Sequence, residues 1–185
     1  MKVVVGLGNP GPRYTGTRHN VGFAVLDNLI QGPNIYRCPD RFQAQIAELH
    51  EDVYKVLLVK PQTFMNLSGQ CVRQAIDFYQ LALENLLVVC DDFNLPLGRL
   101  RIRARGSCGG HKGLRDIESH LGTNLYSRLR IGVDAPQEGE AVDHVLSRFR
   151  PAEKEIIDKA IAWAAQAVLT WVHNGIEFCM NQYNG

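Results

Sequence analysis

The sequence predicts one α/β domain over residues 1–185. With 185 residues, 45% of them hydrophobic, the chain is long enough to bury one sizeable core, and no linker-like run of Ser, Pro or Gly divides it. Short apolar runs typical of buried strands alternate with longer stretches whose apolar residues recur at helical spacing. This order of elements is typical of a sheet flanked by helices.

The first half of the chain contains a buried strand, a helix and a hairpin. Three successive valines predict a strand at residues 3–5, and apolar residues at helical spacing predict a helix over 21–30. Two strand-like segments, 42–49 and 53–59, lie on either side of a polar turn and predict a β-hairpin. Residues 34–40 show neither pattern and are expected to form a loop.

The second half alternates strands and helices in the same way. A continuous apolar run predicts a central strand, and two alternating segments predict further strands. Pro151 suits the first turn of the longest helix. The expected elements are strands at 86–90, 99–105 and 125–133, helices around 72–79 and 114–121, a long helix from 151 and a short one from about 176.

The composition argues against a membrane protein and against a disulfide-bonded one. The N-terminal apolar stretch is too short for a signal peptide, and no later run approaches the roughly 18 apolar residues of a membrane span. The five cysteines are odd in number, scattered and free of C-x-x-C pairs, which predicts reduced thiols and no zinc site. We therefore expect a cytoplasmic protein that has no membrane partner.

The net charge of +1 hides a basic segment. Eight Lys or Arg residues against two acids give residues 99–130 a charge of +6, which leaves −5 for the remainder. Residues 99–105 alternate, so their four arginines share one face of the expected strand. Four like charges repel one another, which favours phosphate binding over a merely solvated face. Arg128 and Arg130 are expected to widen this basic face.

A glycine-rich loop follows the first strand. Residues 6–11 match the G-x-G-x-x-G dinucleotide fingerprint, but Pro10 and Pro12 favour a turn and postpone the helix that holds a pyrophosphate. Asp27, at about the distance of the fingerprint's acid, falls within the expected helix instead. We therefore favour a loop that presents Asn9 to a ligand over a nucleotide site. An ordinary turn asparagine before proline is the alternative.

His19 is the candidate general base. It lies between the glycine-rich loop and the next helix, and an imidazole with an ordinary pKa of about 6.5 can take a proton from water at neutral pH. Such a base needs a carboxylate to orient it. Asp91 follows the central strand, where open α/β sheets place their sites. The alternative is that Asp91 or Asp92 only caps the following turn.

Two further loops carry candidate ligand contacts. Asn66 lies at a strand-to-helix junction, where it either caps the helix or offers its amide to a ligand, and Phe64 and Met65 before it are candidate core residues. His111 follows a second glycine-rich loop whose backbone can approach a ligand closely. It is either a second catalytic group or a polar substrate contact. The histidines expected to be structural are His50, His120, His144 and His173.

Together, these motifs closely resemble bacterial-type peptidyl-tRNA hydrolases. They occur in that family's order over nearly the whole chain and are jointly specific. The matching stretches are 6–11, Tyr14, 17–22, 60–69, 91–92, 95–98, 109–111 and 128–132. The resemblance implies a monomeric α/β fold of the phosphorylase/hydrolase-like type, with a mixed, mostly parallel, twisted sheet flanked by helices. It implies neither a cofactor nor a metal.

The resemblance also implies an activity, the hydrolysis of the ester that joins a peptide to the 3′ ribose of tRNA. Water is then the nucleophile, His19 activates it, Asp91 holds the imidazole, and Asn9 positions the water or the scissile carbonyl. The partner is peptidyl-tRNA, bound through its acceptor stem and 3′ end. The implied substrate contacts are Asn66 near the ester, Tyr14, Phe64 and Met65 along the cleft, His111 on the opposite wall, and Arg101, Arg103 and Arg130 at acceptor-stem phosphates.

One position departs from the family pattern. Lys112 stands where the family usually has an asparagine of the hydrogen-bonding wall, so it either weakens substrate alignment or adds a phosphate contact. A non-catalytic RNA-binding relative of the same fold is the alternative function, because a fold does not by itself determine activity. A nucleotide-cofactor enzyme ranks third, because it leaves the arginine strand unexplained.

Overall fold

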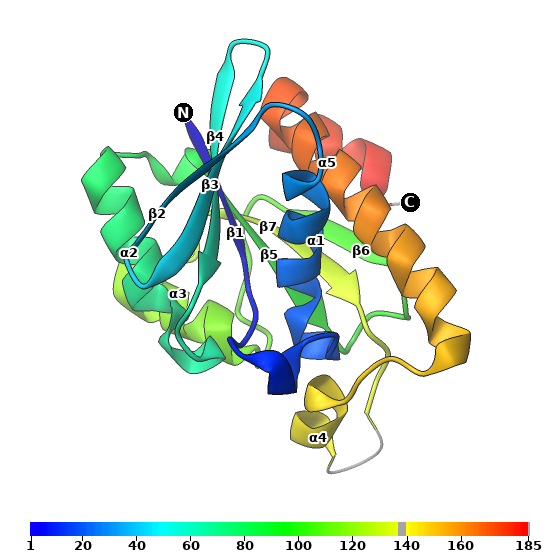
Figure 1. Ribbon diagram of the computed structural model, residues 1–185. Coiled ribbons are helices and arrows are strands. Elements are labelled where there is room, and N and C mark those ends of the chain that lie inside the picture. The colour runs from blue at the N-terminus through cyan, green and yellow to red at the C-terminus, as the bar shows by residue number, and fades with distance from the viewer. Residues whose placement is uncertain (137–139, 185) are drawn as a thin grey trace.

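The computed structural model describes residues 1–136 and 140–184. Its centre is a seven-stranded sheet in the order β2-β3-β4-β1-β5-β7-β6 (Figure 1). Strands β4, β1, β5 and β7 pair in parallel, whereas the pairs nearer the edges are antiparallel, which confirms the expected mixed α/β sheet. The strands are β1 (Lys2–Gly6), β2 (Ile35–Arg41), β3 (Ala44–Glu51), β4 (Tyr54–Pro61), β5 (Leu86–Asp92), β6 (Leu100–Arg103) and β7 (Ser127–Gly132).

Helices cover both faces of the sheet (Figure 1). The alternation of side chains along a strand supplies an apolar surface to each layer, so Val4 packs on the α1 and α5 side while Val3 and Val5 pack on the α2 and α3 side. The helices are α1 (Val21–Ile30), α2 (Ser68–Tyr79), α3 (Lys112–Leu121), α4 (Ala141–Leu146) and α5 (Pro151–Tyr183), with short 3-10 turns η1 (Pro12–Tyr14), η2 (Arg18–Asn20), η3 (Met65–Leu67) and η4 (Leu83–Asn85).

Two glycines let β1 and α1 approach closely beside the site. A Cβ on Gly6 would lie 2.4 Å from the carbonyl oxygen of Gly22, and a Cβ on Gly22 would lie 2.5 Å from the backbone nitrogen of Leu7. Any side chain at either position would push the helix away from the strand. The loop between them is thereby held at the carboxyl end of β1, and the helix begins only at Val21, as Pro10 and Pro12 predict.

The prediction of a loop at residues 34–40 is wrong, because most of this segment belongs to β2. This strand lies at the edge of the sheet and pairs antiparallel with β3, with an irregular register between Cys38 and Arg41. Most of its side chains are exposed or half-buried, and Pro39 lies within it. An edge strand of this kind has no buried face to impose alternation and tolerates proline, so its sequence lacks a strand pattern.

Helix α5 bends at Gly175, where φ is 82°. The Lys2 ammonium donates hydrogen bonds of 2.8 and 3.0 Å to the carbonyls of Trp171 and Val172, which lie in the last helical turn before this bend. The short helix expected from about 176 is therefore the last part of α5. Pro151 occupies the first turn as expected. No helix in the described ranges is long and apolar enough to cross a membrane.

Candidate active site

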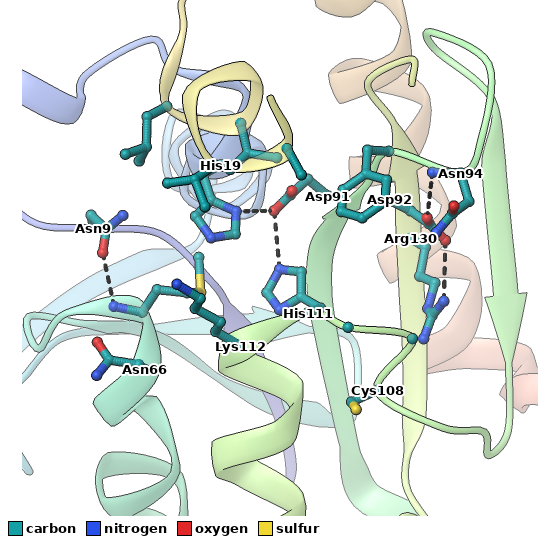
Figure 2. Close-up of a pocket in the computed structure, with 18 of the residues that line it drawn as sticks. Asn9, His19, Asn66, Asp91, Asp92, Asn94, Cys108, His111, Lys112 and Arg130 are labelled. Atoms are coloured by element: carbon teal, nitrogen blue, oxygen red, sulfur yellow. Dashed lines mark hydrogen bonds and ion pairs between the residues drawn. The ribbon is translucent and has the colours of Figure 1, made fainter. Parts of the chain in front are cut away.

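His19 and Asp91 meet at the carboxyl ends of the central strands, 72 residues apart in the chain. His19 lies in η2 and Asp91 near the end of β5, and their side chains are joined by a hydrogen bond of 2.7 Å from Nδ1 to Oδ1 (Figure 2). Both residues are buried, His19 with 9% and Asp91 with 3% of its surface exposed. The bond holds Nδ1 protonated in the neutral ring, so Nε2 is left as the basic atom.

Asp91 is held as a carboxylate. Burial alone would raise the pKa of its carboxyl, but the attraction of and hydrogen bonds from His19 and His111 outweigh burial and lower this pKa well below its usual range. A carboxylate in this position can stabilise the positive charge that a general base gains when it takes a proton.

His111 is a second partner of the same carboxylate oxygen. Its Nε2 lies 3.1 Å from Asp91 Oδ1, while its Nδ1 accepts the backbone N–H of Leu114 at 3.3 Å and so caps α3. An Nδ1 that accepts a hydrogen bond leaves the proton of the neutral ring on Nε2, which therefore donates to Asp91. His111 thus links the start of α3 to the carboxylate that orients His19, a contact that the sequence did not reveal.

Asn9 is oriented by two sets of hydrogen bonds. Its Oδ1 accepts the backbone N–H of Met65 at 2.8 Å, and its backbone N–H and C=O pair with the side chain of Asn20 at 2.8 and 3.0 Å. The Met65 N–H requires the amide oxygen, so the amide nitrogen is turned the other way, toward His19 in Figure 2. Within the part of the chain that the structure describes, this nitrogen has no partner, so it is available to donate to a ligand.

These groups face a cleft of about 320 Å³. Tyr14 and Phe64 form one wall, with ring centroids 6.4 Å apart in an edge-on arrangement, and the buried Met65 also lines the cleft. Asn66 lies exposed in the cleft lining, and no capping hydrogen bond from its side chain to α2 is present among the described residues. Of the two alternatives for Asn66, its position supports the ligand contact over the helix cap.

Asp92 differs from its neighbour Asp91. Its Oδ1 accepts the backbone N–H of Asn94 at 2.9 Å and its Oδ2 forms an ion pair of 3.1 Å with Arg130 (Figure 2). The turn-cap alternative considered for this pair of acids therefore applies to Asp92. Arg130 also donates to the carbonyl of Ser107 at 2.6 Å, so it braces the second glycine-rich loop against the end of β5.

The basic face is narrower than the sequence suggests. Antiparallel pairing sets Arg101 opposite Arg130 and Arg103 opposite Arg128, so all four lie on one face of the sheet. Arg101 and Arg103 are exposed on the edge strand. Arg128, however, is fully buried and donates to the carbonyls of Ser107 and Asn124 and to Glu118, so the expectation that Arg128 widens the basic face is wrong.

Helix α4 forms a wall of the cleft that we did not predict from the sequence. Ala141, Val142, Val145 and Leu146 line the cleft together with Phe93. Their spacing is that of one helix face and is the local signal that was available. A second missed feature is Arg18, buried beside His19, which pairs with Glu153 at 2.8 Å and contacts the segment before α5 through Ser147.

The described residues contain one cluster with metal-ligand spacing. Ligand atoms of His19, Asp91 and His111 lie within 4.8 Å of one another. Both nitrogens of His111 are already engaged, one with the Leu114 N–H and one with Asp91, and His19 Nδ1 is also bonded to Asp91. The arrangement is that of a proton-sharing network in which a metal would have to displace both donors to Asp91.

A buried histidine oriented by a carboxylate, next to a free amide donor in an open cleft, is an arrangement typical of hydrolases, here on an α/β fold. A family model described as peptidyl-tRNA hydrolase matches residues 3–185, and the chain belongs to this family.

Relatives match over the whole chain. A peptidyl-tRNA hydrolase from Caldanaerobacter subterraneus subsp. tengcongensis is 47% identical over 185 residues, with 100% of both chains covered. One from Syntrophomonas wolfei is 48% identical over 184 residues with the same coverage. Among solved structures, the peptidyl-tRNA hydrolase of Acinetobacter baumannii superposes with a TM-score of 0.93 at 38% identity and covers 100% of this chain and 95% of its own.

Proposed function

We propose that this protein hydrolyses the ester between the peptide and the 3′ ribose of peptidyl-tRNA, and so returns free tRNA to translation. The observation that carries the proposal is the buried His19–Asp91 pair of 2.7 Å at the wall of an open cleft. Membership of the peptidyl-tRNA hydrolase family supports the same reaction. The substrate points to a cytoplasmic enzyme, and the family resemblance points to a monomer, in which one chain supplies every proposed catalytic group.

In the proposed mechanism His19 Nε2 takes a proton from a water molecule, whose oxygen attacks the ester carbonyl. Asp91 stabilises the imidazolium that results. The tetrahedral intermediate then collapses, the bond to the ribose oxygen breaks, and that oxygen takes the proton back from His19. The products are a peptide with a free carboxyl group and a tRNA with a free 3′ end, and the enzyme forms no covalent intermediate.

Asn9 would donate to the negative oxygen of that intermediate. Its amide nitrogen is the available donor, because Met65 N–H occupies its oxygen. An amide fixed before the reaction loses no free energy to reorganisation when the charge develops, which is the condition for effective stabilisation of an oxyanion. The support for this role is the hydrogen-bond pattern around Asn9 and its direction toward His19.

The remaining cleft residues would hold the two ends of the substrate. Asn66 would bind the peptide backbone or the terminal ribose, and the aromatic and apolar wall of Tyr14, Phe64 and Met65 would accept the peptide. His111 would contact the substrate from the opposite wall while it holds Asp91. Arg101 and Arg103 on the β6 edge, with Arg130 nearer the cleft, would bind acceptor-stem phosphates through charge-assisted hydrogen bonds.

The test is the release of peptide from an N-acetylated aminoacyl-tRNA by the wild type and by His19→Ala, with tRNA binding measured in parallel. We expect turnover to fall by more than about a thousandfold in His19→Ala while tRNA binding persists. His50→Ala, which changes an exposed histidine of β3, is the matched control and should retain turnover. A folded wild type that binds tRNA but releases no peptide would instead support the non-catalytic RNA-binding alternative.

A further inference from the structure

Lys112 introduces a positive charge into the catalytic cleft. It is the first residue of α3, and its side chain extends into the space lined by His111 and Asn66 (Figure 2). Within residues 1–136 and 140–184, no carboxylate lies within the 4.0 Å of an ion pair with its ammonium group. The positive end of the α3 helix dipole lies at the same place and adds to the same potential.

The two carboxylates of the described lining are both already engaged. Asp91 accepts hydrogen bonds from His19 and His111, and Asp92 pairs with Arg130. The charged and titratable groups that line the cleft with Lys112 are Tyr14, His19, Asp91, Asp92, Cys108, His111 and Arg130. Lys112 therefore has no ion-pair partner among these groups, and both carboxylates of this set already bind other side chains.

The base of Lys112 is held in place by tight packing of the next residue. A Cβ on Gly113 would lie 2.6 Å from the sulfur of Met65 and 3.2 Å from Cε1 of His111. A side chain at position 113 would have to displace the Met65 side chain, so glycine lets the first turn of α3 pack closely against Met65 and His111. The backbone of Lys112 is thereby positioned, and its exposed side chain lines the same cleft as Asn9 and Asn66, the residues proposed to hold the acyl end of the substrate.

We propose that Lys112 is a specificity-determining residue that repels the free α-ammonium group of aminoacyl-tRNA and so favours substrates with an acylated nitrogen. The proposal deepens and rests on the proposed function. In peptidyl-tRNA the α-nitrogen next to the scissile ester is part of a neutral amide, whereas in aminoacyl-tRNA it is a cation below its pKa. A cation in the cleft leaves the amide unaffected and raises the free energy of the bound ammonium.

The experiment compares three substrates that share one tRNA and one side chain: N-acetyl-phenylalanyl-tRNA, phenylalanyl-tRNA, and the α-hydroxy analogue in which a neutral hydroxyl replaces the amine. The measured quantity is the ratio of kcat/KM between two substrates, corrected for spontaneous hydrolysis. Contacts with the shared tRNA and the ionisation of His19 cancel in this ratio. The proteins are the wild type, Lys112→Gln, Lys112→Arg, and Lys159→Gln as a control for an exposed cation on α5.

We expect Lys112→Gln to lower the ratio of acetylated to free-amine substrate about three- to tenfold at pH 6.5. Lys112→Arg and Lys159→Gln should keep the wild-type ratio. In the wild type the ratio should fall as pH rises through the pKa of the amine, about 7 to 8, because the neutral amine is no longer repelled. In Lys112→Gln this pH dependence should be weaker, and the ratio of acetylated to α-hydroxy substrate should be unchanged.

Two results would overturn the inference about Lys112. If Lys112→Gln slows all three substrates by the same factor, the ammonium contacts the tRNA that they share. If it changes the acetylated to α-hydroxy ratio as much as the acetylated to amine ratio, Lys112 contacts the amide and does not sense charge. Loss of the proposed function itself is distinguishable, because the wild type would then fail to hydrolyse the acetylated substrate.

Discussion

The carboxyl ends of β1 and β5 and the β6 edge of the same sheet both carry polar side chains, but in opposite states. At the carboxyl ends His19 and Asp91 are buried and hydrogen-bonded to each other. At the edge Arg101 and Arg103 extend into solvent. Proton transfer needs a fixed distance and little water, whereas phosphate binding needs accessible charge. Substitutions at the first region should therefore change kcat, and substitutions at the second should change KM and its salt dependence.

After the loss of His19 itself, the largest effect on kcat is expected for Asp91, the carboxylate that orients this base. Asp91→Asn should lower kcat at least about a hundredfold, because a neutral amide does not stabilise the imidazolium and no longer selects the Nδ1–H tautomer. Steady-state kinetics with N-acetylated aminoacyl-tRNA measures this change in kcat. Asp92→Asn is the matched control, and it should act on KM through Arg130 more than on kcat. Equal loss of kcat in both variants would refute separate roles for the two acids.

Removal of the Asn9 amide donor should lower kcat nearly as much. Asn9→Asp keeps the oxygen that accepts the Met65 N–H but replaces the donor nitrogen by a second acceptor. We expect kcat to fall about a hundredfold with little change in thermal stability, because the oxyanion loses a donor and meets a negative charge. A kcat within about threefold of the wild type would show that Asn9 does not donate in the transition state.

The buried ion pair next to the site should govern acid stability. Burial alone would raise the pKa of Glu153, but hydrogen bonds from Arg150 and Arg18 outweigh it and lower this pKa to about 2, below the ordinary value of 4.5. A depressed pKa stabilises the fold above the ordinary value, and this stabilisation is lost as pH falls from about 5 toward 2. Glu153→Gln should lower the free energy of unfolding by about 2 kcal/mol at pH 7.

Urea unfolding between pH 7 and pH 3 checks this pH dependence. The Glu153→Gln protein should lose less of its remaining stability over this range than the wild type does, since the titrating group is gone. Glu155→Gln is the control on the same helix, because Glu155 forms an exposed pair with Lys159. Its effect should stay below about 0.5 kcal/mol. Parallel stability curves for the wild type and Glu153→Gln would contradict the role of Glu153.

Substitutions on the basic β6 edge should change the affinity for tRNA. The double variant Arg101→Gln and Arg103→Gln should raise KM about tenfold at low salt and reduce the slope of log affinity against log salt by about one to two, while kcat changes little. Filter binding of tRNA over a salt series measures the slope. Lys159→Gln on α5, in the opposite helix layer, serves as the control for loss of an exposed cation. An unchanged salt slope in the double variant would place the RNA elsewhere.

The smallest effect on activity is expected for Asn184, which lies near the C-terminus and bonds to strand β6. The Asn184 amide accepts the Ile102 N–H at 2.6 Å and donates to its carbonyl at 3.0 Å, and so takes the place of a neighbouring strand between Arg101 and Arg103. Asn184→Ala should raise KM about twofold and speed hydrogen exchange of the Ile102 amide. Slow exchange in this variant would indicate that the edge is held by other contacts.

Local sequence patterns were sufficient to predict most of the helices and strands and the residue types of the candidate active site. Apolar runs and helical spacing identified β1, β5, α1 and α5 because burial of one face imposes a period on the sequence. Edge strand β2 and the short helix α4 escaped, since the first has mostly exposed side chains and the second is brief. The residue types that suit a base, its carboxylate and an amide donor stood at element ends, where the sequence marks them as candidates.

The sequence by itself determined the α/β class, the basic segment, and His19 and Asp91 as separate candidates, because periodicity, charge and residue chemistry are local properties. The tertiary structure alone decided which candidates meet. It joined His19 to Asp91 across 72 residues, added His111 to the same oxygen, and buried Arg128 while leaving Arg101 and Arg103 exposed. Such outcomes depend on strand order and on the packing of loops against strand ends, and a residue's sequence neighbours carry no information about either.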